Sequence, residues 1–311
     1  MSMPCVDASM IPAFPQFKPL SSEDLSFIFS HLKLFSRSIC ELNLANLFLW
    51  QDFDHPQLTC INHNLCLLIS PENESPYFLE PLTHHKLLET VKVCLNHTGR
   101  ISRASENFVS LLPLETFKIE PLRSQFDYLY LREDLANLKG RKYDGKRNHI
   151  RRFRASHPNY TFKALSPNDE NEALKLFEKW FHFKEGSKYY PKLAYIAQKN
   201  ALEKAFAYFE KLKLFGGAIW TEKQLGGFLV GSTLNSQTAD LHFLYGDPEL
   251  PGIVPTLLSE ASQKIFGAFK YLNLEQDLGI PGLRQSKLSY YPIKLEKKFE
   301  ISAVLKSSLF K

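Results

Sequence analysis

Apolar residues recur along the chain at two spacings, which predict alternating helices and strands. Positions three and four residues apart predict helices, and short apolar runs between polar turns predict strands. In the first half, the pattern gives helices at 25–32, 40–50, 83–95 and 104–112 and strands at 17–20, 58–61, 65–70, 77–81, 117–120 and 126–131. In the second half, it gives helices at 145–156, 166–180, 193–212, 254–269 and 282–289 and strands at 160–165, 217–221, 225–234, 239–246, 271–275 and 298–305. This alternation is typical of a mixed α/β fold.

The order of elements in the first half returns in the second. FKPLSSEDLSFIFSHL (17–32) parallels FKALSPNDENEALKLF (162–177), and both begin with a shared Phe and Lys followed by Leu and Ser. A predicted hairpin with the polar turn Asn62-His63-Asn64 has a counterpart with the turn Glu222-Lys223-Gln224. These repeats predict a duplication. We expect lobes at 1–135 and 136–311, each of normal domain size.

Cysteine usage and hydropathy bound the class of protein. Five cysteines lie in the first third of the chain, odd in number and without CxxC spacing: Cys5, Cys40, Cys60, Cys66 and Cys94. This pattern argues against a disulfide framework and a zinc site, so we expect reduced thiols and no metal. No apolar run approaches the roughly 18–20 residues that span a bilayer, and the N-terminus does not resemble a secretory signal. We therefore expect a soluble, cytoplasmic protein.

The segment KGRKYDGKRNHIRRFR (139–154) is strongly basic. It holds eight Lys or Arg residues and one acid, a local charge of +7, whereas the chain carries +5; the remainder therefore sums to −2. Asp144 is expected to cap a helix that ends before Pro158 and turns Ile150 and Phe153 toward the protein.

Localised positive charge favours a polyanion partner. The candidate phosphate contacts of this basic helix (139–156) are Lys142, Lys146, Arg147, Arg151 and Arg154. The alternative is a solvated helix face that makes scattered salt bridges.

The stretch ADLHFLYGDPELPGIVPTLLSEASQKIF, followed by FKYLNLE, predicts strand, loop, helix and strand. This order resembles the donor-binding element of Gcn5-related N-acetyltransferases, where a helix N-terminus holds phosphate. Here Gly252 is the single loop glycine, and Pro248, Pro251 and Pro255 remove N–H donors. The loop therefore disfavours coenzyme A as donor.

The stretch NLEQDLGIPGLRQSKLSYYPIKLEKKF (273–299) carries most of the candidate chemistry. Glu275 and Asp277 follow a predicted strand, where α/β folds collect ligands. Arg284 and Lys287 share one face of the next helix. Arg284 can hold a carboxylate or phosphate with two hydrogen bonds, and Lys287 a phosphate or a developing oxyanion. The alternative is an Asp277–Arg284 ion pair that fixes the last helix to the sheet.

Three other residues are weaker candidates. His242 and Asp247 flank the strand before the donor loop, and Tyr290 can supply a hydroxyl. Each of these residues is more often structural than catalytic. No Ser/His/Asp constellation follows from spacing alone.

Together DLANLKGRKYDGKRNHIRRF (134–153) and the 273–299 stretch resemble the C-terminal catalytic domain of the phosphatidylglycerol lysyltransferases, a family with anchor-free members. The resemblance covers about 17–299. It implies two tandem Gcn5-related acetyltransferase-like lobes joined by the basic helix, related to Fem-type aminoacyltransferases. It also implies transfer of an aminoacyl group from tRNA to a hydroxyl or amine of a phosphatidylglycerol-type lipid or a peptide, with aminoacyl-tRNA as co-substrate and no other cofactor.

The resemblance suggests roles for these residues. Lys287, Arg284 and Asp277 are expected to be catalytic. The expected substrate-binding residues are Glu275, His242, Asp247 and Tyr290. The basic helix is expected to contact tRNA, with peripheral contact to anionic lipid.

One departure keeps alternatives open. Leu244-Tyr245 stands where the resemblance implies an acid and a base such as Glu-Lys. This favours a non-catalytic RNA- or anion-binding module on a degenerate acyltransferase scaffold. A coenzyme A-dependent N-acetyltransferase is a third possibility.

Overall fold

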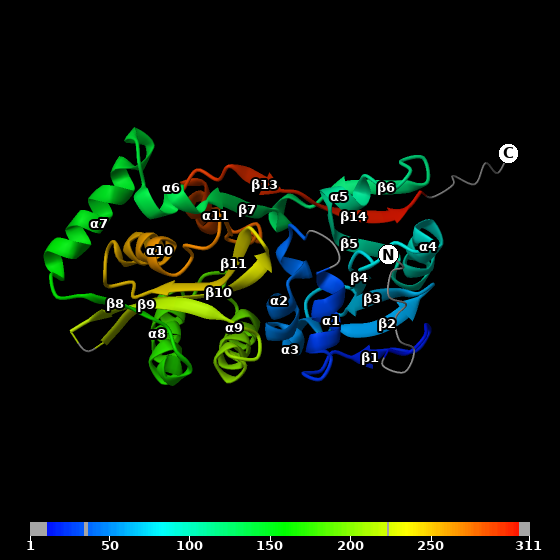
Figure 1. Ribbon diagram of the computed structural model, residues 1–311, viewed down its shortest axis with the longest axis horizontal. Helices are drawn as coiled ribbons and strands as arrows, with labels where there is room; N and C mark the ends of the chain where they lie inside the picture. Colours follow the sequence, from blue (N-terminus) through cyan, green and yellow to red (C-terminus); the bar gives the residue numbers. More distant parts are fainter. Residues whose placement is uncertain (1–10, 34–36, 223, 305–311) are drawn as a thin grey trace. The chain divides into compact units, whose positions relative to one another are not determined.

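A computed structural model describes residues 11–33, 37–222 and 224–304. The chain forms two compact units. The first contains the described residues up to Phe126 and from Glu296 onward, and the second is Asp127–Leu295. Within the described residues, each unit is built on one seven-stranded mixed sheet flanked by helices (Figure 1). The predicted mixed α/β class with two lobes is confirmed.

The first sheet has the strand order β1-β2-β3-β4-β5-β14-β6. Its strands are β1 (Lys18–Pro19), β2 (Gln57–Ile61), β3 (Asn64–Ile69), β4 (Tyr77–Phe78), β5 (Arg100–Ser105), β6 (Phe117–Pro121) and β14 (Lys298–Ala303). Its helical segments are α1 (Leu25–Leu32), η1 (Cys40–Leu42), α2 (Leu44–Leu49), α3 (Gln51–Asp54), α4 (Leu87–Thr98), α5 (Glu106–Val109) and η2 (Arg123–Gln125).

Strand β3 shows why this sheet is covered on both faces. Every residue of β3 is buried. Leu65, Leu67 and Ile69 pack in a cluster that includes residues of α1 and α2. Cys66 and Leu68 point the other way, into a cluster with α4 and α5. After Asn64 the strand is continuously apolar, because successive side chains point to opposite faces and both faces are covered.

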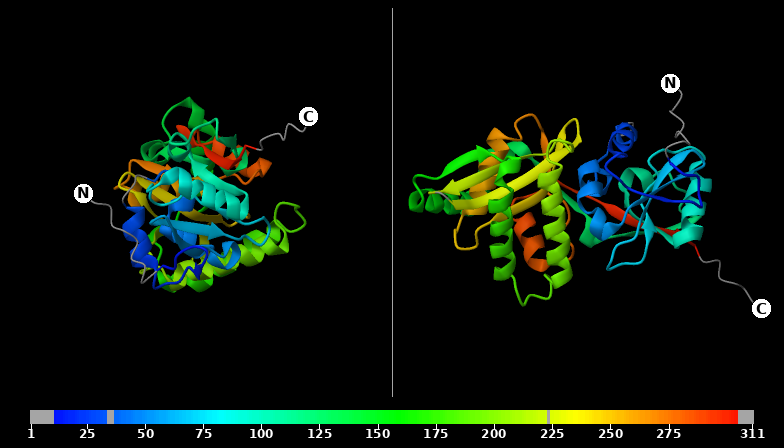
Figure 2. Two further views of the ribbon diagram at one scale, coloured as in Figure 1. Left: turned by 90° about the vertical axis from the view of Figure 1, so that its right-hand side faces the viewer. Right: turned by 90° about the horizontal axis from the view of Figure 1, so that it is seen from below.

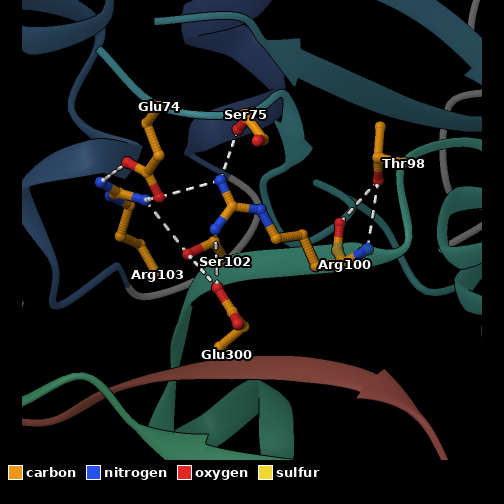
Figure 3. Close-up of polar contacts among 7 residues, drawn as sticks. All are labelled: Glu74, Ser75, Thr98, Arg100, Ser102, Arg103 and Glu300. Carbon is orange, nitrogen blue, oxygen red and sulfur yellow. Dashed lines mark hydrogen bonds and ion pairs between the residues drawn. The ribbon is translucent and has the colours of Figure 1, made fainter.

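Strand β14 comes from the end of the described chain and lies between β5 and β6. Its Ile301 is opposite Ile101 of β5 on one side and Ile119 of β6 on the other. Figure 3 shows an ion pair beside this pairing, in which Arg100 Nη1 of β5 lies 3.0 Å from Glu300 Oε2 of β14. The C-terminal strand is therefore an interior strand of the first sheet.

The second sheet has the order β13-β7-β12-β11-β10-β9-β8. Its strands are β7 (Asp127–Leu131), β8 (Thr161–Ala164), β9 (Phe215–Thr221), β10 (Gln224–Asn235), β11 (Thr238–Gly246), β12 (Tyr271–Asn273) and β13 (Lys294–Glu296). Its helical segments are α6 (Arg132–Asn137), η3 (Arg141–Tyr143), α7 (Asp144–Ser156), η4 (Pro167–Asp169), α8 (Glu170–Phe183), α9 (Lys192–Ala207), α10 (Ile253–Lys264) and α11 (Pro281–Leu288).

Helices cover both faces of this sheet. Figure 1 shows α8 and α9 on one face and α10 on the other, and Figure 2 shows α8 and α9 side by side. Ile253, Leu257 and Ala261 are buried at helical spacing on α10 and join the core with Leu229 of β10. This apolar stripe fixes the helix to the sheet.

The two sheets support the predicted duplication. Read from β1 in one sheet and from β8 in the other, the first five strands follow one another in chain order, as β1-β2-β3-β4-β5 and β8-β9-β10-β11-β12. In both sheets the last two of these five strands, β4 and β5 or β11 and β12, are parallel. The local turn also repeats. Ser21 N and Oγ donate to Asp24 Oδ2 at 2.9 and 2.7 Å, and Ser166 N and Oγ donate to Asp169 Oδ2 at 2.8 and 3.0 Å.

The units differ from the predicted ranges 1–135 and 136–311 in two places. The first boundary lies at Phe126/Asp127, because β7 pairs with β12 and so belongs to the second sheet. The residues from Glu296 onward return to the first unit, because β14 pairs with β5 and β6.

Several element boundaries also differ. The predicted helix 40–50 is divided into η1 and α2, because Asn43 is extended and its side chain caps α2 at Ala45 N. The helix expected from Thr83 begins at Leu87, because the Thr83 hydroxyl donates instead to Asn64 Oδ1 at 2.9 Å. The predictions at Cys5, Lys223 and Leu305 lie outside the described residues.

Two further features of the described residues concern the cysteines and the helices. Cys40, Cys60, Cys66 and Cys94 are free thiols, and all but Cys60 are buried. Among the described residues, no helix combines the length and apolarity needed to cross a bilayer.

Candidate functional site

Strands β11 and β12 part within the second sheet. They pair in parallel only from Thr238–Asp240 to Tyr271–Asn273. Strand β11 continues to Gly246, whereas β12 ends at Asn273. The carboxyl ends of parallel strands are where α/β folds place ligands. This parting is therefore the place to look for chemistry.

A β-bulge lies in β11 at the parting. Val230 of β10 is opposite Phe243, but the next residue, Gly231, is opposite Leu241. His242 is thus the extra residue of the bulge. Bulges redirect side chains and are frequent near active sites.

His242 joins two other side chains into a hydrogen-bonded chain. Its Nε2 lies 2.8 Å from Ser232 Oγ of β10, and its Nδ1 lies 2.9 Å from Glu275 Oε1, just after β12. Burial lowers the pKa of His242, and the nearby Asp240 carboxylate opposes this only in part. The imidazole is therefore neutral near pH 7. Spacing did not reveal this constellation.

The backbone around Glu275 is held in a left-handed conformation. Its φ is 55°, which is uncommon for a residue other than glycine. The Glu275 N–H donates to Asn273 Oδ1 at 2.7 Å, and its carbonyl accepts from Tyr128 N at 3.2 Å. Such a conformation persists only where neighbours fix it, and it is frequent at functional sites.

Asp277 and Arg284 form a two-bond ion pair. Arg284 Nε and Nη2 donate to the Asp277 carboxylate at 2.8 and 3.0 Å. The Tyr128 hydroxyl and Gly279 N donate to the same carboxylate at 2.6 and 2.8 Å. The Asp277 side chain has no exposed surface. This geometry favours the alternative interpretation, an ion pair that fixes α11, over a catalytic Asp277.

Lys287 points from α11 to the end of β12. Its Nζ donates to the carbonyl oxygens of Leu274 and, at 3.1 Å, Glu275. The Lys287 ammonium group therefore helps to fix the backbone at Leu274 and Glu275.

Two of the weaker candidates have structural partners. Asp247 Oδ2 accepts from Lys179 Nζ of α8 at 2.8 Å, and its Oδ1 accepts from Glu249 N at 2.9 Å. Tyr290 is buried, with its ring 3.8 Å from Lys146 Nζ. Of the predicted substrate-binding residues, the structure brings together His242 and Glu275.

The position Leu244-Tyr245 has a packing explanation. Tyr245 is buried and its ring contacts Phe177 and Trp180 of α8. Its hydroxyl donates to Gln198 Oε1 of α9 at 2.8 Å. An acid or base at position 245 would face an aromatic core.

The basic helix α7 divides into paired and solvent-facing charges. Arg147 donates to Asp144 and to Leu138 O and, at 2.8 Å, Gly140 O. Arg154 Nη2 lies 2.9 Å from Glu260 Oε1. These two guanidinium groups are occupied by protein acceptors, contrary to the expectation that both face phosphate.

The other predicted phosphate-binding residues, Lys142, Lys146 and Arg151, have weaker contacts with acidic side chains or none that the described residues show. Lys142 Nζ lies 4.0 Å from Asp134. Arg151 donates to Asn148 Oδ1 at 3.0 Å, and Lys146 stacks on Tyr290. Within the described ranges, Arg151 and Lys146 form no ion pair.

Two grooves flank α11. One of about 320 Å³ is lined by Lys146 and His149 of α7, by Gly252, Val254 and Pro255 at the start of α10, and by Ser286 and Tyr290. The other, of about 520 Å³, is lined by Gly279, Pro281, Arg284, Gln285, Leu288, Ser289 and Tyr291.

The start of α10 presents few N–H groups. Ile253 donates its N–H to Leu250 O at 3.1 Å, and Pro255 has none.

Asp240, His242 and Glu275 bring possible metal-ligand atoms within 4.8 Å of one another. Both ring nitrogens of His242 already have hydrogen-bond partners. A metal bound by His242 would have to break one of these hydrogen bonds.

The family described as "Phosphatidylglycerol lysyltransferase, C-terminal" matches residues 32–301. This chain belongs to that family. Membership confirms the resemblance and supports a transferase of the aminoacyl class. No curated protein matches the chain.

Solved structures share the lysyltransferase-domain fold. A conserved protein of unknown function from Bacteroides thetaiotaomicron is 28% identical with a TM-score of 0.83, over 95% of this chain and 100% of that one. L-PGS from Bacillus licheniformis is 14% identical with a TM-score of 0.62, over 91% and 93%. FemX is 9% identical with a TM-score of 0.58, over 93% and 97%. At such low identity, the last two show the fold alone.

Proposed function

We propose that this chain transfers an aminoacyl group from a charged tRNA to a hydroxyl or amine acceptor. The observation that carries the proposal is the Glu275 carboxylate, held by His242 where β11 and β12 part. Family membership supplies the reaction class.

The chemistry asks little of the protein. An aminoacyl ester is already activated, so the enzyme has to position the acceptor and stabilise charge at the ester carbonyl. A carboxylate beside the reacting carbon can accept the acceptor's proton or bind the amine of the aminoacyl group. No cofactor other than the charged tRNA is needed.

The smaller groove is the proposed place for the tRNA end. Lys146 and His149 line it, and Arg151 lies one turn further along α7. Lys146 is half-buried, and this desolvation lowers the pKa of its ammonium group. A phosphate beside Lys146 would offset that cost.

The larger groove is the proposed acceptor side. Leu288 and Tyr291 are exposed large hydrophobic residues there, and Arg284, which is paired with Asp277, also lines this groove. An apolar surface suits the acyl chains of an amphiphile such as a phosphatidylglycerol-type lipid at a membrane surface.

The test is transfer of radiolabelled amino acids from charged tRNA into lipid extract or peptide. A labelled product supports the proposal. Binding of tRNA without product would instead favour the non-catalytic RNA-binding module. If neither is seen, but acetyl-CoA raises the melting temperature, the coenzyme A-dependent reaction takes its place.

A further inference from the structure

We infer that Glu275 is the base that takes the proton of the acceptor's attacking group, and that His242 and Ser232 position its carboxylate through one hydrogen-bonded chain, called here the Ser232–His242–Glu275 relay. The inference rests on the proposed function and assigns the proton transfer within it.

The three residues of the relay differ in how far solvent can reach them. The His242 side chain has no exposed surface and Ser232 is 3% exposed, whereas the Glu275 side chain is 13% exposed. A substrate can therefore reach the relay at the carboxylate. This reverses the arrangement of a serine hydrolase, in which the serine is the accessible end. An acyl-serine intermediate is accordingly not part of the inference.

The hydrogen bonds define the tautomer of His242. An ionised Glu275 only accepts, so Nδ1 of a neutral His242 must carry the proton and donate it. Nε2 is then an acceptor, and the Ser232 hydroxyl donates to it. Ser232 is thus a positioning residue that keeps the donating nitrogen toward Glu275.

The charged surroundings hold the carboxylate in place. Asp240 lies on the strand of His242, and Lys287 reaches the Glu275 carbonyl from α11. Asp277, two residues after Glu275, and Arg284 of α11 form an ion pair, so their charges cancel. The Lys287 ammonium group thus contacts the Glu275 backbone, and the Asp277–Arg284 ion pair adds no net charge.

The transfer step balances without a further reactant. The acceptor oxygen or nitrogen forms a bond to the aminoacyl carbonyl carbon, and its proton passes to Glu275. The ester bond to the ribose oxygen of the tRNA breaks, and that oxygen takes the proton from Glu275. The relay ends in its starting state.

The test combines single-turnover transfer with variants of each member. Glu275→Gln should lower the rate on the order of 10²–10⁴-fold, as expected for loss of a general base, with KM for charged tRNA within about threefold of the wild type. Ser232→Ala should lower it by up to about 10²-fold through misplacement, and Ser232→Thr, which keeps the hydroxyl, should restore it. Glu172→Gln, a half-exposed acid on α8 that pairs with Lys175, is the control.

A second readout does not depend on activity. In ¹⁵N spectra of the wild-type protein, His242 should be the neutral tautomer protonated at Nδ1, and Ser232→Ala should shift its Nε2 signal. Protonation at Nε2 instead would overturn the relay. So would an active wild type whose Glu275→Gln variant transfers within about threefold of it. An inactive wild type, by contrast, would overturn the proposed function, and the relay's assignment with it.

Discussion

Asp277 illustrates how a buried carboxylate is kept ionised. Burial alone would raise its pKa, but hydrogen bonds from Arg284, Tyr128 and Gly279 N outweigh that effect and hold the pKa well below its ordinary value. Stability from such a group is present above the unfolded-state pKa and is lost as the pH falls through the folded-state pKa.

This gives a prediction for acid denaturation. Asp277→Asn should lower the free energy of unfolding at pH 7 by about 3 kcal/mol, the lower end for a broken buried pair because the Arg284 side chain is 37% exposed. The difference from the wild type should shrink as the pH falls below about 4. Urea unfolding from pH 7 to pH 3 measures it. Glu133→Gln, an exposed acid on α6, should show no such pH-dependent difference.

The sequence could not choose between the two interpretations of Asp277. Its partner Tyr128 is 149 residues away, and only the pairing of β7 with β12 brings the two together. Ser232 was missed for a similar reason. Its distance to His242 depends on the register of a hairpin, and the bulge changes that register within the hairpin.

At the scale of elements, two arginines of helix α7 are predicted to have different roles: Arg151 binds tRNA, and Arg147 stabilises the fold. Arg151→Ala should weaken tRNA binding and reduce the slope of log K against log salt by about 0.7–0.9, one phosphate contact. Arg147→Ala should leave that slope unchanged and lower stability, because Arg147 bonds Gly140 O and Asp144. Filter binding over a salt series distinguishes the two. Equal slopes for both variants would contradict the assignment.

The contact between α7 and α10 depends on one glycine. Gly252 has φ +90°, and a Cβ there would lie 2.4 Å from His149 O of α7. Gly252→Ala should therefore destabilise the protein by at least about 2 kcal/mol, from backbone strain and overlap.

Gly282 in α11 is the matched control, because a Cβ there meets nothing within 4 Å. Gly282→Ala should be neutral or stabilising by up to about 1 kcal/mol. Chemical denaturation of both variants gives the comparison. A larger loss for Gly282→Ala would show that the strain argument is wrong.

Element types were more predictable than their limits. Helix α1 and the β2–β3 hairpin lie where apolar spacing predicts them. The helix expected over 40–50 is divided at Asn43, because a side-chain cap inside an apolar run competes with helix continuation.

At the scale of the whole molecule, β14 is predicted to be essential to the first unit. Removing residues 296–304 should leave β5 and β6 without their shared partner and abolish protection of their amides against hydrogen exchange, while the β10–β11 amides stay protected. A peptide of residues 296–304 added in trans should restore part of the protection. Unchanged β5 exchange after the deletion would contradict this role.

The sequence predicted two lobes, but it did not predict that β7 belongs to the second sheet and β14 to the first. Strands β7 and β14 read as ordinary short strands, and nothing in their residues states which sheet each joins. The sheet that each strand joins is decided by pairing between segments far apart in the sequence, and local patterns do not encode such pairing.

The position of β14 also orders events during protein synthesis. The ribosome delivers β1 to β6 well before residue 303, an interval of roughly 10–35 s at ordinary elongation rates. Throughout that time, β5 and β6 carry unpaired edges that invite association with other nascent chains. The first sheet is thus begun before the second and completed after it, so β5 and β6 need protection from other chains until the ribosome has passed residue 303.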